Sequence, residues 1–353
     1  MKIIKYIFLI SIFAFSNSNI FANEDFIFEN QSHLIHKKDN FISGYNYESN
    51  IKTSKYSPYI KASYLLYQPI QKGMSYAFFD NQNANHIDRV KEVDFKLQSG
   101  FELNLGLNFS EYDDYNLNFS YLFFRSTVKD TAFSDVNSTI LKLKPLWHTN
   151  DLLVNASTIN AKWDLDLDLI DLKTSRSYYV GKFITLEPSL GIKTGRIYQK
   201  FVETIFRLSS INSFQDESKS NSWIIGPTIS TNAKWFLNEI FSIKTNLEYA
   251  LFYQNFKAKH FEQDPANPAN LEVNITNDSY DFNSSIKLSF NFEAGKYLKN
   301  DNMYLAVNLG YDTLIFFNQN YMRHLKDLFK SYDSKNIGDL HLHGLNLSLS
   351  FNF

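Results

Sequence analysis

Asp164, Asp166 and Asp168 stand at alternate positions and are the clearest candidates for ion chemistry in the sequence. In an extended strand, alternate side chains share one face and lie about 7 Å apart. Two like charges at that separation repel each other by roughly 2 kcal/mol at an effective dielectric of 20. We therefore expect mobile cations, or a divalent ion held by two carboxylates, beside this triplet. The alternative is a solvated acidic strand end that has no effect on conduction.

The eight histidines do not have the spacing of a metal site. No pair has the helical spacing of metal ligands. His341 and His343 share one face of a predicted strand, where a two-histidine metal site is the alternative to a merely polar pair at a membrane interface. We favour the polar pair, so the sequence predicts no metal and no cofactor. The other six histidines fall in predicted loops or in an N-terminal lead-in: His33, His36, His86, His148, His260 and His324.

Motifs of covalent catalysis are missing from the sequence. It has no Cys, which excludes disulfides, thiolate metal sites and a Cys nucleophile. It has no Gly-rich phosphate loop and no Gly-x-Ser-x-Gly motif. A barrel enzyme with a site at its rim is the rival class, but no Ser pairs with a His in neighbouring predicted strands. We therefore predict that the protein is not an enzyme.

Apolar and polar residues alternate in many segments, and this period of two predicts β-strands. The clearest run, 93–109, exceeds the 9 to 11 residues that a tilted strand needs to cross a bilayer. Beyond the N-terminal segment no stretch approaches 18 uncharged apolar residues, so a closed barrel is the remaining way to span a membrane. The connections alternate short and long, as periplasmic turns and extracellular loops do in outer-membrane barrels, and the long ones include 199–221 and 254–277.

We therefore predict an all-β fold, a closed antiparallel transmembrane barrel over 58–353. The count is about ten strands, or twelve if 140–146 and a neighbouring segment are strands rather than an external loop. The last nine residues alternate without an error, and we expect them to form the closing strand that the barrel-assembly machinery of a Gram-negative bacterium recognises. Its outward residues are then Leu345, Leu347, Leu349, Phe351 and Phe353.

The first 22 residues have the pattern of a secretory signal peptide. Lys2 and Lys5 precede an apolar run, and a short polar region ends at Ala22. We expect export, cleavage after Ala22, and then a flexible periplasmic lead-in, or a plug inside the lumen, over 23–57. Without Lys2 and Lys5, 33 of the 35 basic residues remain against 37 acidic ones, so nothing attracts nucleic acid.

Two irregularities in the pattern predict local structure. The apolar set moves from odd to even positions between Leu169 and Ile170, and a phase change of one residue indicates a β-bulge. Met322, Leu325 and Phe329 have helical spacing, which indicates a short amphipathic helix. That helix either folds over the barrel mouth or lies on the surface.

The polar faces of the predicted strands cannot meet lipid, so we expect them to line the lumen. Together they carry a modest acidic excess, which predicts a narrow, weakly cation-selective pore. The predicted lumen residues are Asp94, Lys96, Glu102, Asp164, Asp166, Asp168, Glu187, Lys193, Lys244, Glu248, Asp281, Lys287 and Asp312.

Several segments together resemble the chlamydial major-outer-membrane-protein-like porins, including the Legionella-type pore-forming proteins. The segments are YIKASYLLYQPIQKGMSYAF, SGFELNLGLNFSEYDDYNLNFSYLFF, AKWDLDLDLIDLKTSRSYYVGKFITLEPSLGIKTGRIYQKF and GDLHLHGLNLSLSFNF. The third is the most specific, because six of its residues have the spacing of that family: Trp163, Asp168, Asp171, Leu172, Pro188 and Gly191. The chlamydial proteins are rich in Cys, whereas this chain has none, so a role in disulfide cross-linking does not carry over.

The resemblance implies an outer-membrane porin for ions and small solutes. The alternative is an outer-membrane adhesin or structural barrel that acts through its surface loops. The expected surroundings are outer-membrane lipid, the assembly machinery, and ions and small solutes. The oligomeric state, monomer or homo-oligomer, stays open.

Overall fold

The computed structural model describes residues 56–81, 89–109, 115–134, 141–149, 156–207, 213–263, 271–298, 303–329 and 337–353. The predicted signal peptide lies outside these residues, and so does the predicted lead-in up to residue 55. In the part of the chain that is described, no helix is both long and apolar enough to cross a membrane.

The described chain is built almost entirely of strands. They are β1 (Tyr56–Gln71), β2 (Ser75–Asn81), β3 (Arg89–Glu92), β4 (Gln98–Phe109), β5 (Tyr115–Phe133), β6 (Leu141–Pro145), β7 (Ala156–Arg176), β8 (Tyr178–Val180), β9 (Ile184–Arg207), β10 (Ser213–Phe236), β11 (Phe241–Gln263), β12 (Leu271–Leu298), β13 (Met303–Phe316) and β14 (Leu340–Asn352). The helix α2 (Tyr321–Phe329) lies between β13 and β14.

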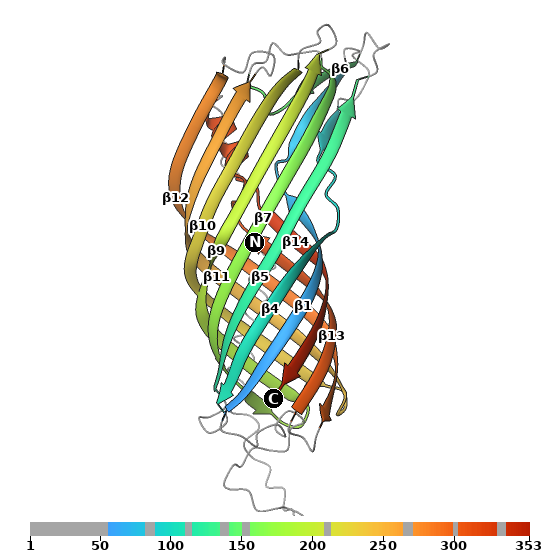
Figure 1. Ribbon diagram of the computed structural model, residues 1–353, viewed down its shortest axis with the longest axis vertical. Helices are drawn as coiled ribbons and strands as arrows, with labels where there is room; N and C mark the ends of the chain where they lie inside the picture. The colour runs from blue at the N-terminus through green and yellow to red at the C-terminus, as the bar shows by residue number, and fades with distance from the viewer. Residues whose placement is uncertain are drawn as a thin grey trace, which may run out of the picture. The chain divides into compact units, whose positions relative to one another are not determined.

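Within the described residues, ten strands close into one antiparallel ring (Figure 1). The order is β1, β4, β5, β7, β9, β10, β11, β12, β13 and β14, and β14 pairs back with β1. The prediction of a closed barrel with ten strands is confirmed. Segment 140–146 supplies the short strand β6, which pairs with β2 and meets β7 through Leu143 and Ala156. It is no ring strand, so the alternative of twelve is not realised.

The outer face of the ring carries a continuous apolar band. On β10 the band runs from Trp235, 58% exposed, to Trp223, 45% exposed, with Ile225 and Ile229 between them. The twelve residue steps between the two tryptophans rise by about 28 Å at 3.3 Å per residue and a tilt of 45°, which is close to the thickness of a bilayer's hydrocarbon core. Tryptophans at both ends match the aromatic girdles of a membrane-spanning barrel.

The strands continue beyond this band at the end of the barrel opposite Phe353, called here the upper end. From Trp223 to Ser213, β10 rises by about 23 Å more. Two connections predicted as long, 199–221 and 254–277, are therefore mostly strand: β9 reaches Arg207, β11 reaches Gln263 and β12 begins at Leu271. The prediction of long loops is wrong at these two places, because polar outward residues above the lipid hide the strand pattern.

At the upper edge of the band, the apolar residues of a strand change from the outer face of the barrel wall to the inner face. On β7, Ile170 and Leu172 face outward and are exposed, while Leu165 and Leu167 face inward and are fully buried. The pairing of β7 with β5 is unbroken, and its pairing with β9 shifts only between Ala156 and Thr158. There is no β-bulge at 168–170, and that prediction is wrong. The phase change marks the passage of a regular strand from lipid to water.

The closing strand shows the same exchange. Leu345, Leu347 and Leu349 are about half exposed on the outer face, as expected. Higher on β14, Leu340 and Leu342 are buried inside the barrel. The role of this strand in assembly remains a prediction.

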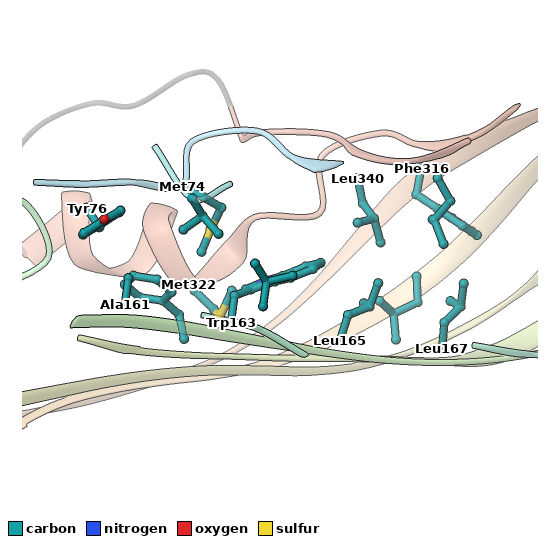
Figure 2. Close-up of a cluster of buried hydrophobic side chains, with 14 of the residues drawn as sticks. Met74, Tyr76, Ala161, Trp163, Leu165, Leu167, Phe316, Met322 and Leu340 are labelled. Carbon is teal, nitrogen blue, oxygen red and sulfur yellow. The ribbon is translucent and has the colours of Figure 1, made fainter. Parts of the chain in front are cut away.

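Apolar side chains fill the upper lumen (Figure 2). Met74 and Tyr76 of the β1–β2 segment face Trp163 on β7, and Met322 of α2 lies between them. The Tyr321 ring of α2 stacks on Phe256 of β11 at 3.7 Å between centroids. The predicted amphipathic helix therefore exists, and its apolar side packs inside the barrel rather than on the outer surface.

Candidate functional site

A polar cavity of about 360 Å³ occupies the lower lumen. Its lining, taken over the described residues, contains five carboxylates (Glu102, Asp171, Glu187, Glu248 and Asp312) and six lysines (Lys61, Lys173, Lys193, Lys234, Lys244 and Lys287). Seven of the predicted lumen residues are among those that line it: Glu102, Glu187, Lys193, Lys244, Glu248, Lys287 and Asp312.

Glu248 of β11 is the centre of the charge network on one side of the cavity. Lys193 Nζ lies 2.5 Å from Glu248 Oε1 and 3.4 Å from Asp171 Oδ2, and Lys173 also pairs with Glu248. The Lys193 and Glu248 side chains are only 2% and 5% exposed. Charges buried this deeply persist only when they are paired, so the network fixes β7, β9 and β11 relative to one another.

Two more carboxylates of the lining have close partners. Lys287 Nζ lies 3.2 Å from Glu102 Oε2 across the lumen. Asp312 accepts hydrogen bonds from the hydroxyl group of Tyr67 (2.5 Å) and from Asn346 Nδ2 (2.6 Å). Because six lysines stand against five carboxylates, this lining offers no acidic excess to support the predicted cation selectivity.

The acidic triplet lies on the outer face of β7, above the apolar band. Arg125 Nη2 is 2.7 Å from Asp168 Oδ2, and Arg125 Nε is 3.3 Å from Asp166 Oδ1. Thr127 donates a hydrogen bond to Asp164 at 2.7 Å. The prediction that these aspartates face the lumen is wrong, because above the lipid the polar face of the strand is the one that meets water.

Three other predicted lumen residues also lie outside the cavity lining. Asp94 and Lys96 are exposed in the segment before β4, which is shorter than the predicted strand 93–109. Asp281 of β12 accepts a hydrogen bond from the hydroxyl group of Tyr321, at 3.2 Å. It is therefore bound to α2 rather than placed on an ion path.

An apolar layer separates the cavity from the upper end of the barrel. Among the described residues, eight of the ten ring strands contribute to it, and each member is at most 6% exposed. The layer consists of Leu65, Tyr67, Leu122, Phe124, Leu167, Leu169, Ile197, Ile224, Ala250, Phe252, Leu314, Phe316, Leu340 and Leu342. The side chains of this layer are therefore shielded from water in this structure.

Two histidines that were expected in loops, His148 and His260, lie buried above the layer. His260 is within β11, opposite Ser218 of β10, and its Nδ1 is 2.7 Å from Ser218 Oγ. The expectation that no Ser pairs with a His in neighbouring strands is therefore wrong. Ser218 and His260 are 1% and 0% exposed, so this structure leaves a substrate no access to them.

The predicted histidine pair of the closing strand lies on the outer face of β14, beside Leu342 of the apolar layer. His343 Nδ1 is 2.7 Å from the hydroxyl oxygen of Tyr311 on the neighbouring strand β13. This contact fits the polar interfacial pair that the sequence favours.

A closed antiparallel ring with an outward apolar band defines the class of outer-membrane β-barrel proteins. Residues 51–353 match the family model of the Legionella pneumophila major outer membrane protein precursor, and the chain belongs to this family. By the rule that short turns face the periplasm, the lower end is periplasmic and the upper end is extracellular. Among curated proteins, none matches the sequence.

Solved barrels resemble the chain only distantly. The outer membrane protease OmpT from Escherichia coli is 10% identical, with a TM-score of 0.42 over 86% of this chain and 99% of that one. A Pseudomonas aeruginosa FadL homologue is 8% identical, with a TM-score of 0.32 over 87% and 92%. A major outer membrane protein from Thermus thermophilus is 11% identical, with a TM-score of 0.30 over 84% and 99%. Similarity at this level carries no information on the activity of this chain.

Proposed function

We propose that the protein is a closed structural barrel of the outer membrane that holds a rigid β-walled extension at the cell surface. In this proposal it conducts no ions in its resting state. The observation that carries the proposal is the apolar layer, to which eight ring strands contribute. Together with the ion pairs of the cavity below it, this layer favours a stable closed lumen over a permanent aqueous channel.

The energetics of opening support the closed state. Bringing one buried aromatic side chain such as Trp163 or Phe252 into water exposes about 150–250 Å². At 25 cal/mol per Å² this costs about 4 to 6 kcal/mol for each ring. Both side chains are at most 1% exposed, and a channel would need several such side chains to move together.

The extension supports a role in presentation at the surface. Its wall is regular, because β10 and β11 pair without a break from Gln215 to Ile225. Its outward residues include the exposed Lys257 and Lys259 of β11. A stiff support of this kind holds connecting loops at a fixed distance from the membrane.

A narrow gated pore for ions and small solutes is the second candidate. The polar cavity favours it, since a purely structural barrel does not require charged residues in its lower lumen. For this pore to conduct, the apolar layer must separate. Export through the predicted signal peptide is part of both candidates.

Solute flux across proteoliposomes tests the proposal. Liposomes containing the full-length protein should retain salt and small sugars as well as protein-free liposomes do, with a general porin as the positive control. Rapid flux that falls with solute size would contradict the closed barrel and favour the pore. The fraction of folded protein, read from its heat-modifiable mobility on a gel, must be equal in all preparations.

A further inference from the structure

Three buried carboxylates face the lumen side by side in the extracellular extension. Glu203 of β9, Asp216 of β10 and Glu262 of β11 are directly opposed across neighbouring strands. Their exposed fractions are 0, 1 and 0%. Directly opposed like charges destabilise a sheet, and burial adds a further penalty. A buried row of three carboxylates is therefore a place where a bound cation would be stabilised.

An imidazole approaches the row from a separate part of the chain. His148 lies in segment 146–149 after β6, and its Nδ1 is 3.0 Å from Asp216 Oδ1 and 3.3 Å from Glu262 Oε2. The three possible ligand atoms lie within 4.8 Å of one another. A tetrahedral ion 2.0–2.1 Å from its ligands holds them about 3.4 Å apart. The two separations from His148 Nδ1 are close to this distance.

Glu262 has partners that fix its orientation. Thr149 donates to it twice, through its backbone N (2.6 Å) and through Oγ1 (2.8 Å). His260 Nε2 lies 3.1 Å from Glu262 Oε1, and Ser218 holds the other ring nitrogen of His260. Hydrogen bonds of this kind orient the ligating carboxylates of metal sites.

Two carboxylate oxygens of the row give an independent indication of a cation. Asp216 Oδ2 and Glu203 Oε1 are buried and accept no hydrogen bond from any residue that the structure describes. Buried polar atoms normally have a partner.

We propose that His148, Asp216 and Glu262 bind one divalent metal ion of the zinc class. One imidazole and two carboxylates are ligands that suit Zn²⁺. Because all three residues are buried, the ion is structural: it fastens segment 146–149 to β10 and β11 and neutralises the row of carboxylates. This site is additional to the closed barrel of the proposed function.

Elemental analysis of the full-length protein tests the site. The parent and the variants His148→Gln, Asp216→Asn and His343→Gln are exposed to excess Zn²⁺ during folding and then freed of loosely bound metal. The parent and the control His343→Gln, whose histidine lies on the outer face, should keep one zinc per chain. The zinc content of His148→Gln and Asp216→Asn should be at least tenfold lower than that of the parent, while both variants retain the heat-modifiable fold.

No retained zinc in the parent, or equal zinc in all four proteins, would overturn the proposal. Should the two site variants fail to fold, the parent loaded with Co²⁺ decides the matter. Tetrahedral nitrogen and oxygen ligation gives visible absorption bands, and a parent without them would refute the site.

Discussion

Arg125 of β5 and Asp168 of β7 form an ion pair, 2.7 Å between Nη2 and Oδ2, on the outer face of the barrel. The same guanidinium lies 4.2 Å above the ring of Phe123, and Phe123 and Ile170 are exposed just below the pair. Charged side chains therefore begin where the apolar band ends. This pair marks the outer edge of the membrane on β5 and β7.

Cysteine labelling along β7 should reproduce this boundary, since the chain has no Cys of its own. On whole cells, Asp166→Cys should react with a charged maleimide that carries a polymer too bulky to enter a ten-stranded lumen. Leu167→Cys should not react because it is buried, and Ile170→Cys should not react because it faces lipid. Reaction of Asp166→Cys with a small maleimide but not with the bulky one would place the aspartates inside the barrel.

The apolar layer should contribute strongly to stability. Leu167→Ala should lower the free energy of unfolding by about 2–5 kcal/mol, because it leaves a cavity among side chains that cannot collapse around it. Leu328→Ala on α2 is the matched control: that leucine is 47% exposed, and the loss should stay within about 0.5 kcal/mol. Urea unfolding in detergent, followed by heat-modifiable mobility, measures both. Equal losses would mean that the layer is loosely packed or hydrated.

Removing one partner from the cavity's ion pairs should strongly lower the free energy of unfolding. Glu248→Gln leaves Lys193 and Lys173 without their main partner, and we expect the free energy of unfolding to fall by about 3–5 kcal/mol. Asp166→Asn removes a pair in which both side chains are more than a third exposed, so about 1 kcal/mol or less should be lost. The same unfolding assay compares them. A small loss for Glu248→Gln would indicate that water and mobile ions screen the cavity.

The sequence predicted the ring because lipid imposes a simple rule on it. Along Leu345, Leu347 and Leu349 the outer face must be apolar, and the pattern is visible without any knowledge of neighbouring strands. Above the bilayer that rule no longer holds. There Asp164 faces outward and Leu165 faces inward, which is the reverse of the pattern at membrane level. For the same reason, β10 and β11 extend through segments whose composition is typical of polar loops.

The sites were harder to predict, since they depend on which strands meet. Seven predicted lumen residues line the cavity because they lie at membrane level, where polar faces must turn inward. The layer that closes the lumen includes Phe252 and Leu340, whose contacts come from separate strands and are not visible in the local pattern. His148, Asp216 and Glu262 come from three separate segments, so no local spacing joins them. Their juxtaposition follows from the register of β10 with β11 and from the return of segment 146–149 into the lumen.

Single-channel recording in planar bilayers tests the central claim, the closed lumen, most directly. Folded full-length protein should insert without producing steady current steps over the usual voltage range, in the same bilayers in which a general porin does produce them. Long-lived, ohmic current steps from the parent protein, lost when it is unfolded beforehand, would contradict the closed barrel and establish a pore.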